Sequence, residues 1–444
     1  MSVHPIEYRY FYPEMKRIWT EESKLETWLK VEAVLAKVHG KLGNISQSAA
    51  QEIERKASLD FVKLERVKEI EEETEHDLMA MVEALTEVCE ADAKNYVHLG
   101  ATSYDIEDTA LSLQLRDAIR IIESDIDGLK NVLLDLAEKH KETICVARTH
   151  GQHALPTTYG MKFAVWATEM QRHLERLDEA KKRMLVGKMA GAVGTGASHG
   201  EKAEDIHNLV IQELGLEPTL ISTQVVQRDR HAELVVKLAL VAATLDKIAK
   251  EIRNLQRTEI AEIAEPFKQK QVGSSAMPGK RNPHKSERIC GLARIVKSNV
   301  FPALENMSLE HERDLTNSSA ERIIFPETFI LVDYMLREML KILVGLEFFP
   351  ENIIRNLKLS NGIILAELVM TKLVERGMGR QDAHELLRDL SRKTVQERVD
   401  LRDVLKSDER IRKYLTVDDI ENLKEEHYIG RAVEIVENVI KELR

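Results

Sequence analysis

Residues 234–256, LVVKLALVAATLDKIAKEIRNLQ, decide the fold class of this 444-residue chain. Apolar residues recur there at intervals of three and four, which places them on one face of an α-helix with Lys and Glu on the opposite face. That apolar stripe consists of Leu234, Leu238, Val241, Leu245, Ile248 and Ile252. We expect one uninterrupted helix over residues 231–265, about 50 Å long at 1.5 Å per residue, that ends before Pro266.

The positions of the ten prolines extend this prediction to most of the chain. None lies in residues 14–155 or 351–444, so nothing in those parts forces a helix to end. Alternating runs of Val, Thr and Tyr joined by Asn-Gly turns, which would predict β-hairpins, are nearly absent. The sequence therefore predicts an all-α fold built from long helices.

Three helical domains are expected, because a domain has about 150 residues on average. The edges are expected near residues 96–105 and 345–352. The three domains are residues 1–98, an N-terminal helical domain; 99–345, a central long-helix bundle with a loop at 269–287; and 346–444, a C-terminal helical domain. The glycine-dense segment at 187–200 is either a flexible turn or a close approach to a ligand, and both interpretations have equal weight.

Composition limits the class of protein. The net charge of −11 argues against general affinity for nucleic acid, which requires a basic surface. The three cysteines have no C-x-x-C spacing, which excludes a zinc ribbon and favours a reducing compartment. The N-terminal residues lack the apolar core of a secretory signal, and no apolar run reaches the about 18–20 residues of a membrane helix. We expect a cytoplasmic protein with neither a nucleic-acid nor a membrane partner.

One stretch, KQVGSSAMPGKRNPHKSE at residues 270–287, breaks the helical pattern. Six Lys and Arg residues lie between Lys268 and Arg288, against the single carboxylate of Glu287. Backbone N–H groups near Gly and Ser can surround an anion, and Lys adds a point charge. Such a loop suits a substrate whose negative charge grows in the transition state. The alternative is a solvated connection to a helix that starts near Ser286.

Histidines mark two further segments. In VARTHGQHALPTTYG (residues 146–160), His150 and His153 lack a carboxylate or thiol at a spacing that would support a metal site. His150 fits a general acid or base better, because its ordinary pKa of about 6.5 lies near working pH; the alternative is a structural histidine. In ETEHDLMAMV, His76 and Asp77 lie near the start of a predicted helix. We expect no metal.

Two segments offer polar groups at helix starts. Thr102 and Ser103 in HLGATSYDIEDTA are expected to cap the helix that follows, although the same position presents N–H groups to carboxylates. In LEHERDLTNSSAERIIFPE, Arg313, Ser318 and Arg322 are spaced by five and four residues. They form either a surface network of ion pairs or a phosphate clamp of two guanidinium groups and one hydroxyl.

Taken together, these segments resemble a known family. HLGATSYDIEDTA, ARTHGQHALPTT and GSSAMPGKRNP are similar, in this chain order, to the three active-site segments of the fumarase/aspartase superfamily, whose members release fumarate. Within it, YRYFYPEMKRIWTEESKLETWLKVE, HERDLTNSSAERI and LTVDDIENLKEEHYIGRAVEIV resemble the adenylosuccinate lyase family. Two positions depart from that family: Gly279 stands where His or an aromatic residue is common, and Tyr12 replaces an Arg.

The resemblance implies an activity and an assembly. The expected reaction is an anti β-elimination of fumarate from adenylosuccinate to give AMP, and from the succinyl-carboxamide ribotide (SAICAR to AICAR), in purine nucleotide biosynthesis. No cofactor is expected. The family builds each active site from three subunits of a homotetramer, whose long helices form a shared core.

The resemblance also assigns residues. Ser274 is the implied base and His150 the implied acid, and His76 joins this catalytic set while it contacts the nucleotide together with Asp77. The implied substrate-binding residues are Arg9, Tyr10, Glu75, Asp77, His98, Thr102, Ser103, Thr149, Gln224, Lys280, Asn282, Arg288, Arg313, Ser318 and Arg322.

Two other functions fit the same fold. One is another lyase of the superfamily or an enzyme like the carboxymuconate cycloisomerases, which also carry KRNP loops. The other is a structural protein that has lost activity, as in lens crystallins. The presence of Ser274, His150, Lys280 and Asn282 argues against the inactive protein, since a scaffold does not need all four.

Overall fold

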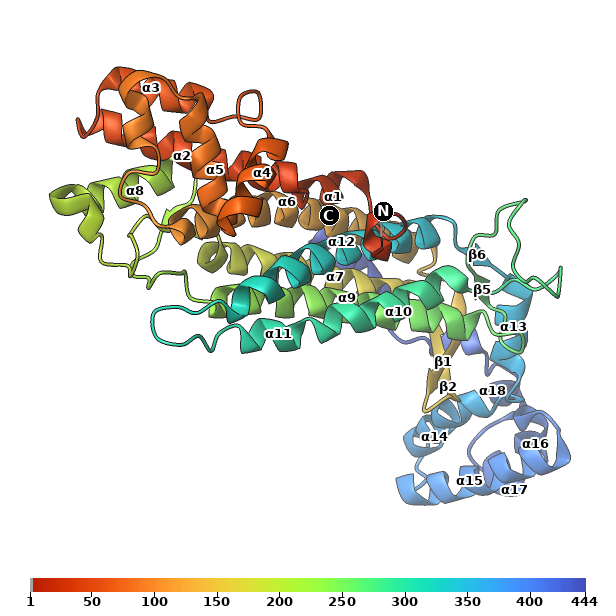
Figure 1. Cartoon of the computed structure of the whole chain (residues 1–444). Coiled ribbons are helices and arrows are strands. Elements are labelled where there is room, and N and C mark those ends of the chain that lie inside the picture. Colours follow the sequence, from red (N-terminus) through yellow and green to blue (C-terminus); the bar gives the residue numbers. More distant parts are fainter. Residues whose placement is uncertain (1–2) are drawn as a thin grey trace. The chain divides into compact units, whose positions relative to one another are not determined.

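The computed structural model describes residues 3–444 and confirms an all-α fold (Figure 1). The chain divides into two compact units. The first consists of residues 3–127, 172–246 and 289–337, and the second of residues 128–171, 247–288 and 338–444. The helices that continue from one unit into the other are α6 (Ser103–Lys139), α7 (Tyr159–Met184), α9 (Asp229–Leu255), α10 (His284–Ser298) and α12 (Thr316–Val344). The division into three domains stays a prediction.

The first unit also contains a group of shorter helices. These elements are η1 (Pro5–Glu7), α1 (Pro13–Ile18), α2 (Glu21–Lys41), α3 (Gln47–Lys56), α4 (Leu64–Thr74), α5 (Asp77–Val88), η2 (Ala91–Tyr96), β3 (Val186–Gly187), η3 (Ala197–Lys202), α8 (Ala203–Glu213), β4 (Glu217–Pro218) and α11 (Val300–Glu305). Side chains of Thr20 and Ser46 cap α2 and α3 by accepting backbone N–H bonds, the usual role of such residues. Helices α2–α5 share one buried core with Ile106 of α6 and Val210 of α8.

The stripe that predicted α9 is buried along its whole length, from Leu234 to Ile252. The predicted end of the helix is wrong, because α9 ends at Leu255, well before Pro266. Residues Ile263–Ala264 form β5, which pairs antiparallel with β6 (Glu347–Phe348). This pairing, together with the buried hydrogen bonds of the Glu262 carboxylate just before β5, prevents the helix from continuing despite the local helical pattern.

Strands are few and short within residues 3–444, but one hairpin was not predicted from the sequence. Residues Ile144–Thr149 and Gln152–Thr158 form the antiparallel hairpin β1–β2. His150 and Gly151 both have positive φ, of 53° and 74°, as a two-residue turn requires when it follows the natural twist of the strands. A His-Gly turn lacks the Asn-Gly signature, which is why the sequence did not reveal it.

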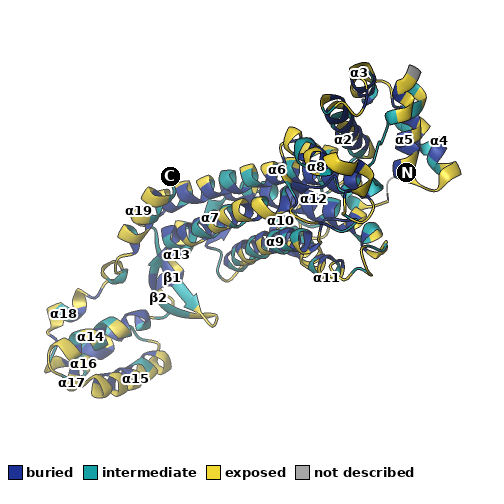
Figure 2. Cartoon of the chain, turned by 90° about the vertical axis from the view of Figure 1, so that its left-hand side faces the viewer, coloured by how far each residue is buried: buried dark blue, intermediate teal, exposed yellow. Residues whose placement is uncertain are grey.

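The second unit ends in a cluster of short helices that packs on this hairpin. These elements are α13 (Pro350–Lys358), η4 (Ile363–Leu365), α14 (Ala366–Glu375), α15 (Arg380–Glu397), α16 (Leu401–Ser407), α17 (Glu409–Arg412), α18 (Val417–Glu421), η5 (Glu425–Tyr428) and α19 (Ala432–Leu443). Val146 of β1 shares their buried core with Leu365, Val369 and Leu405. Their outward faces are exposed (Figure 2). The hairpin is thus held firmly at its base while its turn is free of the core.

Two further expectations concern the chain as a whole. No helix within residues 3–444 is both long and apolar enough to cross a bilayer. The side chains of Cys89, Cys145 and Cys290 are buried.

Candidate active site

Eight of the residues assigned by resemblance line one cavity of about 680 Å³ in the first unit. They are Glu75, His76, Asp77, Ser103, Gln224, Arg313, Ser318 and Arg322. The first turns of α5, α6 and α12 all contribute to its wall. A helix presents partial positive charge and unpaired N–H groups at its N-terminus. These helix starts offer N–H donors to an anion, and Arg313 and Arg322 share the cavity wall with the carboxyl side chains of Glu75, Asp77, Glu107 and Asp314.

Local backbone geometry places His76 and Asp77 at the cavity wall. Glu75 ends α4 in the left-handed conformation, with φ of 53°, and the chain then turns directly into α5. His76 is the N-cap of α5, and its Nδ1 accepts the N–H of Met79 at 3.4 Å. In the neutral ring this assigns the proton to Nε2. Both residues lie at the start of a helix, as the sequence predicted.

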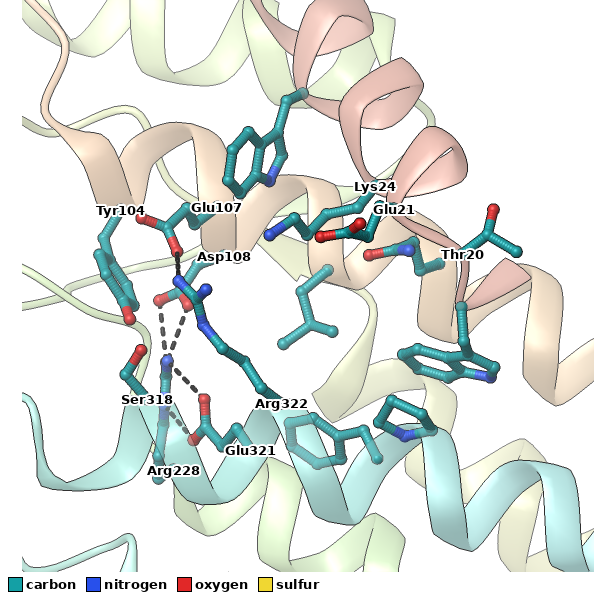
Figure 3. Close-up of a pocket in the computed structure, with 16 residues that line it drawn as sticks. Thr20, Glu21, Lys24, Tyr104, Glu107, Asp108, Arg228, Ser318, Glu321 and Arg322 are labelled. Carbon is teal, nitrogen blue, oxygen red and sulfur yellow. Dashed lines mark hydrogen bonds and ion pairs between the residues drawn. The ribbon is translucent and has the colours of Figure 1, made fainter. Parts of the chain in front are cut away.

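The three residues of the predicted phosphate clamp meet Tyr104 of α6. The Arg313 guanidinium lies 3.6 Å from the centre of the Tyr104 ring, and its Nη1 donates to Oε1 of Gln224 at 2.7 Å. Arg322 donates to Oδ2 of Asp77 at 2.7 Å. Ser318 and Arg322 also line a neighbouring cavity of about 310 Å³ (Figure 3). The two guanidinium groups and the hydroxyl line the same cavity. One of the guanidinium groups, that of Arg322, is already paired with Asp77.

A buried carboxylate at the start of α6 organises the glycine-dense segment. Asp105 accepts bonds from the Lys188 ammonium, from the N–H groups of Ala190 and Gly191 at 2.9 and 3.0 Å, and from the N–H of Thr102 at 2.9 Å. Thr102 and Ser103 stand at the start of the helix as predicted. Gln224 donates to the carbonyl of Ala192 at 2.9 Å, so the segment supports a cavity residue.

His98 lies outside the cavity wall, in the same unit. Its Nδ1 is 2.5 Å from Oε1 of the buried Glu32. Burial disfavours the charged imidazole, but the Glu32 carboxylate outweighs this and raises the pKa of His98 above its ordinary value. The environment of His98 therefore favours a positively charged ring.

Sequence reasoning missed a set of buried charges behind the cavity. Arg228 lies between Asp108, with bonds of 2.8 Å to both carboxylate oxygens, and Glu321 at 2.9 Å (Figure 3). Glu107 lines both cavities. Burial, together with the negative charge of Asp77, raises the pKa of Glu107 to about 7. Glu107 and Asp108 were not singled out from the sequence, although both stand inside the quoted HLGATSYDIEDTA segment.

The second unit holds the predicted acid. His150 lies at the exposed turn of the hairpin, next to Thr149. Two residues earlier, Arg148 donates to the buried Glu262 at 2.5 Å, and the same carboxylate accepts bonds from Tyr159 at 2.6 Å and Asn356 at 2.9 Å. This cluster fixes the strand that carries His150.

The loop with the predicted base is closed on itself in the second unit. The Ser274 hydroxyl oxygen accepts the N–H groups of Ala276 at 3.3 Å and Met277 at 3.1 Å. Asn282 donates to the carbonyl of Gly273 at 2.8 Å. A Cβ at Gly273 would lie 2.0 Å from the carbonyl oxygen of Lys280, so only glycine fits this crossing.

The base of the loop is anchored where α10 begins. The Glu265 carboxylate accepts the N–H groups of Lys285 and Ser286 at 3.3 and 2.5 Å. The helix starts at His284, close to the predicted position. Lys280 and Asn282 line a cavity of about 560 Å³ together with Lys250, Arg253 and Arg257. The loop thus contributes to a basic pocket, as its composition suggested.

Comparison with known proteins identifies the family. The chain matches the family described as "Lyase" over residues 7–297 and the one described as "Adenylosuccinate lyase C-terminus" over residues 362–439. The adenylosuccinate lyase of Pyrococcus abyssi is 60% identical over 440 residues, which cover 99% of this chain and 98% of that protein. This chain belongs to the adenylosuccinate lyase family. The adenylosuccinate lyase of Pyrococcus horikoshii is 59% identical over 441 residues, with the same coverage.

The backbone is also similar to a relative with another activity. The 3-carboxy-cis,cis-muconate lactonizing enzyme from Pseudomonas putida superposes with a TM-score of 0.90 at 33% identity, and the match covers 99% of this chain and 98% of that one. The fold is therefore shared with an enzyme of another activity, whereas the identity of 60% over nearly the full length is with an adenylosuccinate lyase.

The structure does not bring every residue expected from that family into the cavity of the first unit. Tyr10 packs edge-on against Tyr334 at 5.6 Å, with the exposed Arg9 beside it, and neither lines the cavity. Thr149, His150, Ser274, Lys280, Asn282 and Arg288 belong to the second unit. Within residues 3–444 no three His, Cys, Asp or Glu side chains gather as a potential metal site.

Proposed function

We propose that this protein cleaves adenylosuccinate to AMP and fumarate, and SAICAR to AICAR and fumarate, in purine nucleotide biosynthesis. The observation that carries the proposal is the nearly full-length identity of 60% with an adenylosuccinate lyase. The cavity with Arg313, Ser318 and Arg322 supports it, because guanidinium groups and a hydroxyl at helix N-termini match the geometry of a phosphate. A substrate without a nucleotide phosphate has no need of this set.

Ser274 is the proposed base that removes the proton from Cβ of the succinyl group. A serine hydroxyl is a weak base until it loses its proton, so its anion must be stabilised. Two backbone N–H groups already point at the Ser274 oxygen, and they would hold the negative charge of an alkoxide. Lys280 and Asn282 would bind the succinyl carboxylate on which charge accumulates.

His150 is the proposed acid. As the C–N bond breaks, its electron pair moves to the purine-side nitrogen, which takes a proton from the imidazolium of His150. The exposed position of His150 at the hairpin turn leaves its ring accessible to substrate, and the Glu262 cluster holds its strand in place. His76 and Asp77 would contact the nucleotide at the other end of the substrate.

We further propose a homotetramer in which three subunits contribute to each site. Helices α9, α10, α11 and α12 carry exposed apolar side chains in the first unit, among them Leu240, Ile295, Phe301 and Ile323, exposed by 43–69%. Exposed apolar groups on this scale are typical of surfaces that another protein covers. The proposed location is the cytoplasm, where the three thiols would stay reduced.

The test is an ultraviolet assay of the purified protein with adenylosuccinate, run beside the Ser274→Ala variant. Turnover by the wild type and a loss of several orders of magnitude in the variant would support both the activity and the base. If the wild type instead acts on 3-carboxy-cis,cis-muconate and not on adenylosuccinate, the proposed substrate is wrong. A monomer with full activity in sedimentation and assay would contradict the shared site.

A further inference from the structure

Four ionisable side chains from four helices meet between the two neighbouring cavities of the first unit. Nη2 of Arg322 (α12) lies 2.7 Å from Oδ2 of Asp77 (α5) and 3.9 Å from Oε2 of Glu107 (α6). Nζ of Lys24 (α2) lies 3.6 Å from the same Asp77 oxygen. Two carboxyls and two cations therefore form a group of four, which we call the charge cluster. Figure 3 shows Arg322 directed at Glu107.

The electrostatic balance of Glu107 depends on Arg322. Burial and the nearby negative charges of Asp77 and Asp108 oppose its ionisation, whereas Arg322 and Lys24 favour it. The other charged or titratable groups that line the two cavities are Glu21 of α2, Glu75 and His76 before α5, Tyr104 of α6, Arg228 before α9, Arg313 and Asp314 before α12, and Glu321 of α12. Arg228 forms ion pairs with Asp108 and Glu321. Arg322 and Lys24 are therefore the cations that stabilise the ionised form of Glu107.

A phosphate at Arg322 would compete with these carboxyls for the same guanidinium. An arginine pairs with phosphate in a bidentate manner, and Arg322 has a half-exposed side chain that can turn toward a ligand. Once it does, Asp77 and Glu107 face each other with Lys24 as their remaining cation. Two adjacent carboxyls with too few cations share a proton.

We propose that the nucleotide phosphate draws Arg322 away from Asp77 and Glu107, and that Glu107 takes up a proton from solvent in the same step. This inference rests on the proposed function, because it requires a phosphate to bind at Arg322. Glu107 thereby becomes a positioning residue: it holds Arg322 in the empty cavity and releases it by becoming neutral. Substrate and product binding are consequently linked to pH.

The linkage has a definite sign. The pKa of Glu107 is raised to about 7, so the carboxyl is largely ionised above neutral pH and must gain a proton when AMP binds. The Kd for AMP then rises by about three- to tenfold per pH unit above pH 7.5, because each proton taken up per AMP contributes a factor of about ten. The phosphate does not cause this rise, because its second pKa is about 6 and it is already a dianion in that range.

Isothermal titration calorimetry with AMP at pH 8, in two buffers of different ionisation enthalpy, measures the proton uptake directly. We expect between about 0.5 and 1 proton per AMP for the wild type and less than about 0.2 for Glu107→Gln. Glu21→Gln is the matched control, because this exposed carboxyl lies near the cluster and pairs with Lys68, and it should behave as the wild type does. Inorganic phosphate should also bring a proton, whereas adenosine should not.

The outcomes separate this inference from the proposed function. If the wild type cleaves adenylosuccinate and binds AMP without proton uptake, or if Glu107→Gln takes up as much as the wild type, the inference is wrong and the function stands. If the wild type neither cleaves adenylosuccinate nor binds AMP, both the inference and the proposed function are wrong. Thermal melting of Glu107→Gln shows whether this variant is folded. If it is unstable, the proton uptake measured for the wild type still tests the inference, because binding of AMP without uptake would contradict it.

Discussion

Replacing Asp105 by Asn tests whether one buried carboxylate holds the start of α6 and the glycine-dense segment together. Asp105 and Lys188 are both fully buried, and Asp105 also accepts three backbone N–H bonds. Breaking a buried ion pair by removing one partner costs about 3–5 kcal/mol, because the other charge stays buried without compensation. For a unit of roughly 250 residues, 1 kcal/mol shifts Tm by about 2 °C. Asp105→Asn should therefore lower Tm by about 6–10 °C.

A double-mutant cycle with Lys188→Met isolates the ion pair. Lys188→Met leaves a carboxylate that still has its three N–H donors, so we expect a smaller loss of about 1–3 kcal/mol. The double variant should be more stable than the sum of the two losses predicts, by up to about 3 kcal/mol. The assays are thermal melting and amide hydrogen exchange at Ala190 and Gly191, which should speed up in Asp105→Asn. Additive losses, or a Tm within 1 °C of the wild type, would refute the reasoning.

Three other predictions follow from the site and its supports. Arg322→Ala should reduce kcat/KM for adenylosuccinate about 10- to 150-fold, mostly by raising KM, because it removes a charged hydrogen bond worth about 1.5–3 kcal/mol. Steady-state kinetics measures both constants, and an unchanged KM would exclude the phosphate clamp. Gly273→Ala should lower kcat at least tenfold, because the new Cβ would lie 2.0 Å from the carbonyl oxygen of Lys280 and the loop would have to change shape. Tm should not change, since the loop is exposed. A clear drop in Tm would instead indicate a general role of Gly273 in folding. Because the pKa of His98 is raised in the folded state, its pairing with Glu32 contributes full stability below pH about 6.5 and loses it as the pH rises through the raised value. Glu32→Gln should thus lower Tm more at pH 6 than at pH 9, and a loss that does not depend on pH would contradict the assignment.

Helix faces were predictable from the sequence because they depend on local spacing. The stripe from Leu234 to Ile252 is buried as the intervals of three and four required. The end of the same helix was not predictable. It depends on Glu262, whose partners Arg148 and Asn356 lie 114 and 94 residues away in the sequence, and no local pattern contains that information.

The candidate site shows the same distinction. Arg313, Ser318 and Arg322 were found because their spacing within one helix start brings them together. Glu107 was missed because a carboxylate inside a helical pattern has the appearance of a solvent-facing residue, and Arg228 was missed because it lies in the turn before α9, where no periodic pattern marks it. Their burial follows from packing between α6, α12 and the residues before α9, which periodicity does not reveal. His150 was singled out from the sequence as a candidate acid or base, but the hairpin that carries it was not recognised.

The buried group of Asp108, Arg228 and Glu321 has a consequence for the order in which the chain is made. The ribosome produces these residues in that order, and 213 residues separate the first from the last. At about 5–20 residues per second, Glu321 is added roughly 10–40 s after Asp108. Until then Arg228 has only one of its two acidic partners, so the first unit completes its charge pairing late in synthesis although its earliest residues are at the N-terminus. A nascent chain halted before residue 321 should consequently be more open to protease around Arg228 than one halted beyond α12.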